Sequence, residues 1–207
     1  MKTIEDIIKE TKKSAFNKTG YSVNINVKNE QKLKASLLLY IDYDAFSKEN
    51  NITTKDFFSK AIPEFQRSND KWTKDMKVKF VENLLKGLKT EIKLFKLGKD
   101  EDAQIIDGLQ RMTALFDFLS NKIKVFDNFY YKDLENDFSQ FRPQIIVTIY
   151  DFNSLEEAVN FYIEMNENIT HSKKDIQKAK DYLEKISPQK TIEQEKGFID
   201  EFQQPHQ

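Results

Sequence analysis

A chain of 207 residues, 39% hydrophobic and 32% charged, can bury one substantial core and has the ordinary composition of a globular domain. Its 33 Lys and Arg against 34 Asp and Glu leave a formal net charge of -1, which excludes a global positive field for nucleic acid or membrane, so DNA binding would need a local patch. The lack of cysteine excludes disulfides, thiolate zinc sites and cysteine catalysis, and two histidines exclude a His-rich metal centre.

No apolar run approaches the roughly 20 residues that cross a bilayer, and the first residues lack the apolar core of a signal peptide. We therefore expect no membrane partner and an intracellular, cytoplasmic protein, of either bacterial or viral origin.

Residues 1–60 are predicted to form an N-terminal extension of helix and strand that packs on the core. Thr3 resembles the cap of a short helix. Polar and apolar residues alternate in Ser22–Val27, which predicts a half-buried strand, and the apolar run Ser36–Ile41 predicts a second one. Asp44–Lys60 has a helical pattern, broken near Asn50 and restarted at Thr53.

The core is predicted to span residues 61–187. Thr73 is a good cap for a helix that Gly87 ends, and the residues expected to face inward are Met76, Phe80, Leu84 and Leu85. Two strands are expected next, at Glu91–Phe95 and Ala103–Ile106. Lysines at 86, 89, 93, 96 and 99 make a basic strip, which we interpret as a solvated surface.

The second half of the core continues with a short strand at Ile123–Val125, a helix at Leu134–Phe141 and a strong strand at Ile145–Tyr150. Two further helices are predicted, one opened by a capping box at Ser154 and the last running from about Ser172 to Ile186, before a polar tail at 188–207. Strands and helices mix without a regular βαβ alternation, which predicts a compact α+β domain with a mixed sheet.

Residues 105–114, Ile-Ile-Asp-Gly-Leu-Gln-Arg-Met-Thr-Ala, are the most informative segment of the chain. Two β-branched residues lead into the turn at Asp107 and Gly108, and a helical pattern begins at once. The unpaired N–H groups of a first helical turn favour an anion such as phosphate. Gly108 lets the backbone approach closely, and Arg111 adds a planar, permanently charged fork.

A second Gln-Arg pair, Gln66-Arg67, follows Pro63, which requires an extended backbone before it. The two blocks, with Trp72 between them and Asn166 beyond, resemble the N-terminal domain of GmrSD-type modification-dependent restriction enzymes. The hallmark of that family reads Asp-Gly-Gln-Gln-Arg-Leu-Thr, and Asp107–Thr113 matches it at five of seven positions. The resemblance extends from about Ile62 to about Ala179, leaves the first sixty residues out, and implies a ParB/sulfiredoxin-like fold.

The resemblance implies a nucleotide-binding domain that acts as a weak metal-dependent NTPase. In this reading Asp107, Gln110 and Arg111 are the catalytic residues, and Asp107 holds Mg2+ on the phosphates or orients the attacking water. The implied nucleotide-binding residues are Gln66, Arg67, Gly108, Thr113 and Asn166. A nucleoside triphosphate is the expected ligand, and DNA or a separate effector protein the expected macromolecular partner.

Each of these residues also has a structural interpretation. Asp-Gly is a common turn dipeptide, and the pair at 66 and 67 fits a solvated loop. Trp72 is expected to be structural, and Asn166 fits a helix C-terminal cap. Thr113 could cap or pack, and His171 is expected to be exposed.

The chain departs from the family at Leu109, where the hallmark has its first Gln, and we expect this side chain to be partly exposed. The family's restriction enzymes continue into a His-Asn-His nuclease domain that these residues do not match, so we expect no nuclease activity. The leading hypothesis is a nucleotide-binding NTPase domain. The alternative is a non-catalytic DNA- or protein-binding regulatory or viral protein, structural or anti-restriction, that keeps the fold.

Overall fold

The structure is a computed structural model that describes residues 3–5, 20–42, 52–68, 70–98, 101–167 and 172–187. The chain divides into two compact units. The first comprises Met1–Pro63 and Ser68–Asn153, and the second comprises Glu64–Arg67 and Ser154–Gln207. The domain boundaries expected after residues 60 and 187 stay predictions.

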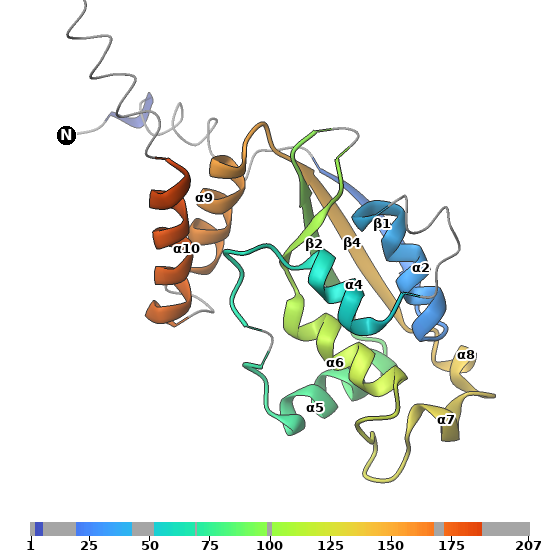
Figure 1. Cartoon of the computed structure of the whole chain (residues 1–207). Helices are drawn as coiled ribbons and strands as arrows, with labels where there is room; N and C mark the ends of the chain where they lie inside the picture. The colour runs from blue at the N-terminus through green and yellow to red at the C-terminus, as the bar shows by residue number, and fades with distance from the viewer. Residues whose placement is uncertain are drawn as a thin grey trace, which may run out of the picture. The chain divides into compact units, whose positions relative to one another are not determined.

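A four-stranded mixed sheet forms the centre of the first unit, with strand order β1-β4-β2-β3 (Figure 1). The strands are β1 (Tyr21–Asn26), β2 (Thr90–Lys96), β3 (Gln104–Asp107) and β4 (Gln144–Asp151). β4 pairs antiparallel with β1 and parallel with β2, and β2 pairs antiparallel with β3. The predicted α+β class and mixed sheet are therefore confirmed, whereas the ParB-like arrangement within that class stays a prediction.

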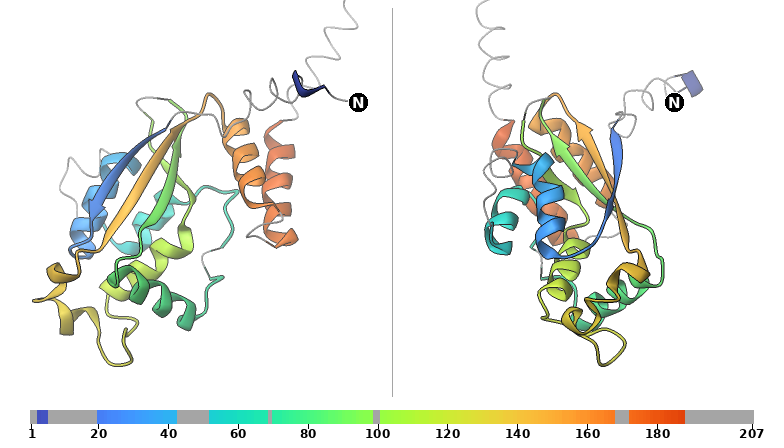
Figure 2. Two further views of the ribbon diagram at one scale, coloured as in Figure 1. Left: turned by 180° about the vertical axis from the view of Figure 1, so that it is seen from behind. Right: turned by 90° about the vertical axis from the view of Figure 1, so that its right-hand side faces the viewer.

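Helices of the first unit cover one face of this sheet. α2 (Glu30–Ile41) contacts β1, α4 (Thr54–Ala61) contacts β3, and α6 (Leu109–Leu119) contacts β2, while α5 (Lys74–Leu85) packs on α6. The core between them is formed by alternate residues of the strands, such as Ile92, Leu94 and Val147, and by buried leucines of the helices. The view from behind shows the strands in front of these helices, so the opposite face carries no helix from the described part of this unit (Figure 2).

The prediction of a strand at Ser36–Ile41 is wrong, because this run is the second half of α2. The Asn29 side chain caps the helix by accepting a hydrogen bond from the Lys32 N–H at 2.9 Å. Leu33, Leu37 and Ile41 follow at intervals of four residues and are buried, so the apolar run is one face of an amphipathic helix.

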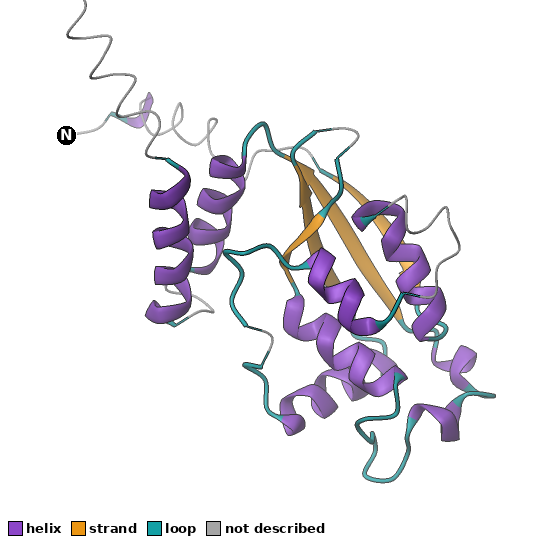
Figure 3. Ribbon diagram, viewed as in Figure 1, coloured by secondary structure: helices purple, strands orange, loops and turns teal. Residues whose placement is uncertain are grey.

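Three smaller corrections concern the edges of the core. Met76 is 48% exposed, and Val81 is buried in its place on the inner face of α5. The strand predicted at Ile123–Val125 is an isolated bridge between Val125 and Phe129. The helix predicted at Leu134–Phe141 is instead two short helices, α7 (Tyr131–Leu134) and α8 (Phe138–Phe141), which Figure 3 shows in purple with a loop between them.

The remaining predicted elements of the first unit are confirmed. β1, which the alternation of polar and apolar residues predicts, and β2, β3 and β4 lie where strands are predicted. Thr53 and Thr73 cap α4 and α5, and Gly87 ends α5 with a φ of 98°. Most of the helix predicted from Thr3, the segment 44–51, Lys99, His171 and the tail 188–207 lie outside the described residues.

The second unit consists of α9 (Leu155–Asn166), α10 (Lys173–Ile186) and the segment Glu64–Arg67. Ser154 caps α9 as predicted, by accepting a hydrogen bond from the Glu157 N–H, and Ser172, where the last helix is predicted to begin, caps α10 by accepting from the Asp175 N–H. The ring of Phe65 packs against Tyr162 of α9 and Tyr182 of α10, with centroids 5.4 and 5.8 Å away. Nowhere in the described part of the chain is a helix long and apolar enough to span a membrane.

Candidate functional site

The predicted strand–turn–helix junction is present at the end of β3. The strand ends at Asp107, Gly108 adopts the left-handed conformation with φ 95°, and α6 starts at Leu109. A Cβ atom on Gly108 would lie 2.6 Å from Cδ1 and 3.3 Å from Cα of Ile92 on β2. Both the backbone angle and the packing against β2 therefore require glycine here.

Asp107 and Arg111 form an ion pair across this junction. The Arg111 guanidinium donates to Asp107 Oδ2 at 2.6 Å, and the Gly108 N–H donates to Oδ1 at 2.7 Å. The Arg111 side chain is 26% exposed and the Asp107 side chain 29% exposed, so the pair can be reached from solvent. Because a guanidinium carries five N–H donors, Arg111 can hold Asp107 and still offer donors to an anion.

The N-terminus of α6 has no side-chain cap among the described residues. In the part of the chain that the structure describes, no side chain caps this helix, whereas asparagine, threonine or serine side chains cap α2, α4, α5, α9 and α10. Within those residues the first-turn N–H groups have no side-chain acceptor as a cap, and together with the positive end of the helix dipole they favour a negative charge at this end of α6.

Strand register places a row of polar residues beside the junction. Lys93 on β2 lies opposite Asp107 on β3 and opposite Thr148 on β4, and Thr148 lies opposite Ser22 on β1. Residues opposite one another project from the same face, so these four side chains cross the sheet in one line, on the face that no described helix of the first unit covers.

Hydrogen bonds extend this row to Glu91, which lies two residues before Lys93 on β2. Thr148 Oγ1 donates to Glu91 Oε1 at 2.5 Å, and the hydroxyl oxygens of Ser22 and Thr148 lie 2.8 Å apart. Lys93 Nζ lies 3.9 Å from Glu91 Oε2. Together with the ion pair at the junction, the polar surface contains two acidic side chains, Asp107 and Glu91, and two basic ones, Lys93 and Arg111.

The charges of both carboxylates of this surface act on the hydroxyl of Tyr150 on β4. Burial raises the pKa of its hydroxyl above the ordinary value, and the negative charges of Glu91 and Asp107 raise that pKa further. A phenol is protonated at neutral pH in any case, and the raised pKa extends the pH range in which this hydroxyl can donate a hydrogen bond.

Glu91, Thr148, Tyr150 and Ser22 are site residues that the sequence analysis missed, and it treated Lys93 only as part of a solvated strip. A signal for them exists in the strands: polar residues at 91 and 93 alternate with buried Ile92 and Leu94. Alternation shows that these residues share a face, but the register that aligns them with Asp107 is a long-range property.

Gln110 has both polar atoms of its side chain engaged inside the first unit. Its Oε1 accepts from the backbone N–H of Trp72 at 3.1 Å, and its Nε2 donates to the backbone carbonyl of Ser68 at 3.0 Å. The side chain is 2% exposed. Gln110 therefore fastens the loop before α5 to the start of α6, and Trp72 lies against Phe80 at 5.5 Å between ring centroids, in the structural role expected for it.

Leu109 and Thr113 both face the interior. Leu109 is 3% exposed and belongs to the hydrophobic core, so the expectation of a partly exposed side chain is wrong. Its position directly after the turn places it under β2 rather than toward solvent, because Gly108 brings the helix start close to Ile92. Thr113 donates from Oγ1 to the Leu109 carbonyl at 2.9 Å, a bond within the helix.

The other predicted binding residues belong to the second unit. The Gln66 carbonyl accepts from Lys178 Nζ at 2.5 Å, and Gln66 Oε1 accepts from the Arg67 N–H at 3.2 Å. Asn166 is buried at the last position of α9 and donates from Nδ2 to the Tyr162 carbonyl at 2.8 Å, which matches the predicted role at the helix end. The convergence of Gln66 and Arg67 with Arg111 on one pocket stays a prediction.

A magnesium site is compatible with the acidic residues of the polar surface. Mg2+ in proteins is often held by one or two carboxylates, with phosphate oxygens of the substrate and water as the other ligands. Asp107 and Glu91, whose charges both act on the Tyr150 hydroxyl, are the candidate carboxylates for such a site. No group of three acidic or histidine side chains suited to an all-protein metal cage occurs among the described residues.

Comparison with known families gives a match that covers most of the chain. Residues 43–205 match the family described as "GmrSD restriction endonuclease, N-terminal domain". The match takes in Asp107–Thr113 and is longer than the expected span of about 62–179, so the expectation that all of residues 1–60 lie outside the resemblance is wrong from residue 43 onward. Comparisons with curated proteins and with solved structures gave no match.

Proposed function

Because the chain belongs to the family of the GmrSD restriction endonuclease N-terminal domain, we propose that it is a restriction-related nucleotide-binding domain whose ligand binds at the β3–α6 junction. The observation that carries this proposal is the arrangement of Gly108, Asp107 and Arg111. Gly108, where any other residue would be strained and would strike Ile92, joins β3 to an uncapped helix N-terminus beside a partly exposed arginine.

Arg111 and the first turn of α6 would bind the phosphates of a nucleoside triphosphate. The guanidinium can place two N–H donors on one phosphate while Asp107 fixes its orientation from the other side. Lys93, opposite Asp107, would add a second positive charge within the same polar surface.

The domain is proposed to hydrolyse the nucleotide slowly with Mg2+. Asp107 and Glu91 would hold the ion, and bound Mg2+ would neutralise charge on the phosphates and align them. Asp107 also accepts from Arg111, so it keeps the guanidinium in place whether or not the ion is bound. The Tyr150 hydroxyl, which is protonated at neutral pH, would donate to a phosphate oxygen or to the attacking water.

In this proposal Gln110 is a positioning residue that acts through the loop before α5. Its amide holds the Ser68–Trp72 loop, so it positions the chain beside the junction instead of contacting phosphate. Gln66, Arg67, Thr113 and Asn166 remain proposed binding residues on the family pattern. Among them Arg67 has no carboxylate partner within the described residues, which leaves its guanidinium available.

A second candidate function is non-catalytic binding of DNA or of a separate effector protein, in a regulatory, viral structural or anti-restriction role. Leu109 favours it, because this buried side chain has neither the donor nor the acceptor that the hallmark glutamine would supply. Under this alternative the fold and the junction are kept and turnover is lost.

The test is a titration of ATP, GTP and CTP with and without Mg2+, followed by measurement of released phosphate. Binding with Mg2+-dependent release that Asp107→Asn abolishes supports the NTPase, and binding without release supports the regulatory alternative. Absence of binding for all three nucleotides overturns the proposal. Plain and modified DNA, incubated with the same protein, should remain uncut.

A further inference from the structure

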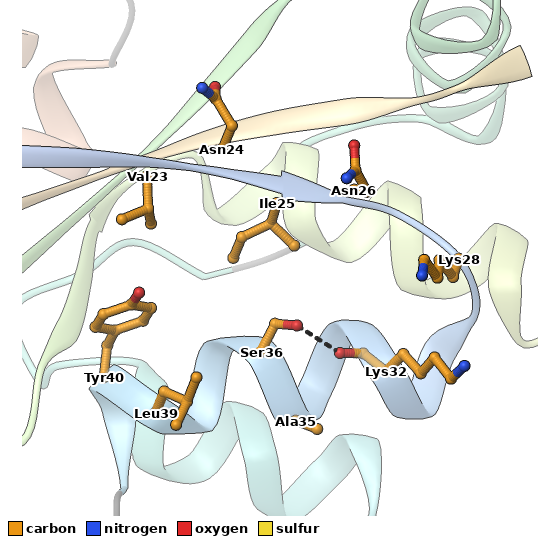
Figure 4. A pocket seen from close by; sticks show the side chains of 10 residues that line it. All are labelled: Val23, Asn24, Ile25, Asn26, Lys28, Lys32, Ala35, Ser36, Leu39 and Tyr40. Carbon is orange, nitrogen blue, oxygen red and sulfur yellow. Dashed lines mark hydrogen bonds between the residues drawn. The ribbon is translucent and has the colours of Figure 1, made fainter.

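A groove lies between strand β1 and helix α2, on the side of the first unit away from the β3–α6 junction. Its volume is about 470 Å³, and it is lined by Val23, Asn24, Ile25, Asn26, Lys28, Lys32, Ala35, Ser36, Leu39 and Tyr40 (Figure 4). Nothing in the proposed nucleotide site uses these residues, so the groove requires a separate explanation.

One end of the groove is apolar. Figure 4 shows Val23 and Ile25 pointing from β1 toward α2, with Leu39 and Tyr40 on the helix below them. Leu39 is 41% exposed, and Tyr21, whose ring centroid lies 6.4 Å from that of Tyr40, is 50% exposed. Large exposed apolar side chains beside a groove are the usual anchors for a partner's side chain.

The other end is basic. Lys28 follows β1 and Lys32 lies in the first turns of α2, and both are exposed. Neither forms an ion pair within the part of the chain that the structure describes, and no acidic residue lines the groove. Glu30, which lies between them in sequence, instead forms an ion pair with Lys34 and accepts a hydrogen bond from the Thr54 hydroxyl. The lysine end is therefore complementary to negative charge.

The strand that forms one wall is an edge strand. β1 is the last strand in the sheet order, and among the described residues it pairs with β4 alone. In an antiparallel pair every second residue directs its N–H and C=O groups at the neighbour, and the others point away. The outer edge of β1 thus offers backbone donors and acceptors along the length of the groove.

We propose that this groove binds an extended acidic segment of a partner protein, which adds to the sheet as a strand beside β1. An apolar side chain of the segment inserts between Val23 and Leu39, and acidic side chains of the segment contact Lys28 and Lys32. Strand addition supplies affinity through the backbone, and the two ends of the groove supply the sequence preference. A nucleic acid fits less well, because both lysines of the lining lie at one end of the groove and the other end is lined by Val23, Ile25 and Leu39.

The experiment uses the full chain and short synthetic peptides in two-dimensional NMR, which detects even millimolar binding. The test peptide alternates valine and serine and ends in glutamates, and its matched control ends in lysines. We expect the acidic peptide alone to shift and protect the amides of β1. The Lys28→Glu/Lys32→Glu variant should bind it about tenfold more weakly or worse, because both attractive contacts become repulsive.

The exposed pair Lys74→Glu/Lys89→Glu has the same charge change outside the groove and should bind like wild type. A folded Leu39→Asp variant tests the apolar end separately and should also lose binding. Equal binding of both peptides, no binding of the acidic one, or loss of binding in both lysine variants overturns the proposal. So does a single-stranded oligonucleotide that binds the groove in place of the peptide. None of these outcomes depends on whether the junction binds nucleotide.

Discussion

Comparing Gly108 with Gly87 separates two reasons why a position can require glycine: the backbone angle and the space available for a side chain. Both have positive φ, 95° and 98°, but a Cβ atom at Gly87 would meet nothing within 4 Å, whereas at Gly108 it would meet Ile92. The cost of the backbone angle is therefore common to both positions, and a steric cost is added only at Gly108.

Gly87→Ala is expected to destabilise the protein by about 1–2 kcal/mol from its backbone angle, and Gly108→Ala by about 1–3 kcal/mol more from overpacking. Urea unfolding of both variants measures the difference. Ile92→Val removes the Cδ1 atom that the new methyl would strike, so it should recover part of the loss in Gly108→Ala. Equal losses for the two glycine variants would show that the junction tolerates a side chain.

Leu109→Gln restores the family residue but introduces an amide into the core. Since Leu109 is 3% exposed, we expect a loss of about 2–4 kcal/mol in the free energy of unfolding, from lost apolar burial and an amide without assured partners. Leu109→Met, which keeps volume and polarity, should lose less than about 1.5 kcal/mol. A glutamine variant as stable as wild type would mean that a polar partner exists at this position.

At the scale of elements, the loop between Ser68 and Trp72 depends on one side chain of α6. Trp72 is the single tryptophan of the chain, so its fluorescence reports directly on this loop. Its N–H and the Ser68 carbonyl both bond to the Gln110 amide.

Gln110→Ala should therefore shift the Trp72 emission to longer wavelength and destabilise the protein by about 1–3 kcal/mol, because it leaves backbone groups without partners. Gln110→Glu keeps the acceptor for Trp72 but loses the donor to Ser68, so its effect should be intermediate at neutral pH. Gln140→Ala, at an exposed glutamine of α8, is the control. An unchanged emission spectrum in Gln110→Ala would show that the loop is held by other contacts.

The strands were predictable because alternation is local, and the capped helices because Thr53, Thr73, Ser154 and Ser172 carry their signal in one side chain. Ser36–Ile41 was misread because a leucine-rich run fits a strand as well as a helix, and the deciding cap lies seven residues earlier at Asn29. The junction at 107–111 could be predicted from a local motif. The polar row beside it could not, since it depends on pairing between residues as distant as Ser22 and Thr148.

At the scale of the whole molecule, four tyrosines, of which Tyr131 is buried and Tyr21 is half exposed, link stability to alkaline pH. The pKa values of Tyr21, Tyr131, Tyr150 and Tyr182 are all raised, first by burial and then by nearby charged or ionisable groups. A folded-state pKa above the unfolded value of 10.0 stabilises the protein below that pH, and this stabilisation is lost as pH rises through the folded-state pKa.

The free energy of unfolding should therefore fall as pH rises above 10.0. In Tyr150→Phe this fall should be shallower than in wild type, because one titrating hydroxyl is gone. Chemical unfolding at a series of pH values measures both slopes, and comparison with wild type cancels the contribution of the lysines. Parallel curves for the two proteins would mean that Tyr150 titrates alike in the folded and unfolded states.

The central claim is that the β3–α6 junction binds the phosphates of a nucleotide, and the affinity of Arg111→Ala tests it most directly. Calorimetric titration should be done with wild type, Arg111→Ala and Arg142→Ala, the last removing an exposed arginine at the end of α8. Loss of a charge-assisted hydrogen bond predicts binding weaker by about 1.5–3 kcal/mol, or roughly 10- to 150-fold, in Arg111→Ala and unchanged in Arg142→Ala. A folded Arg111→Ala protein with wild-type affinity would contradict the account.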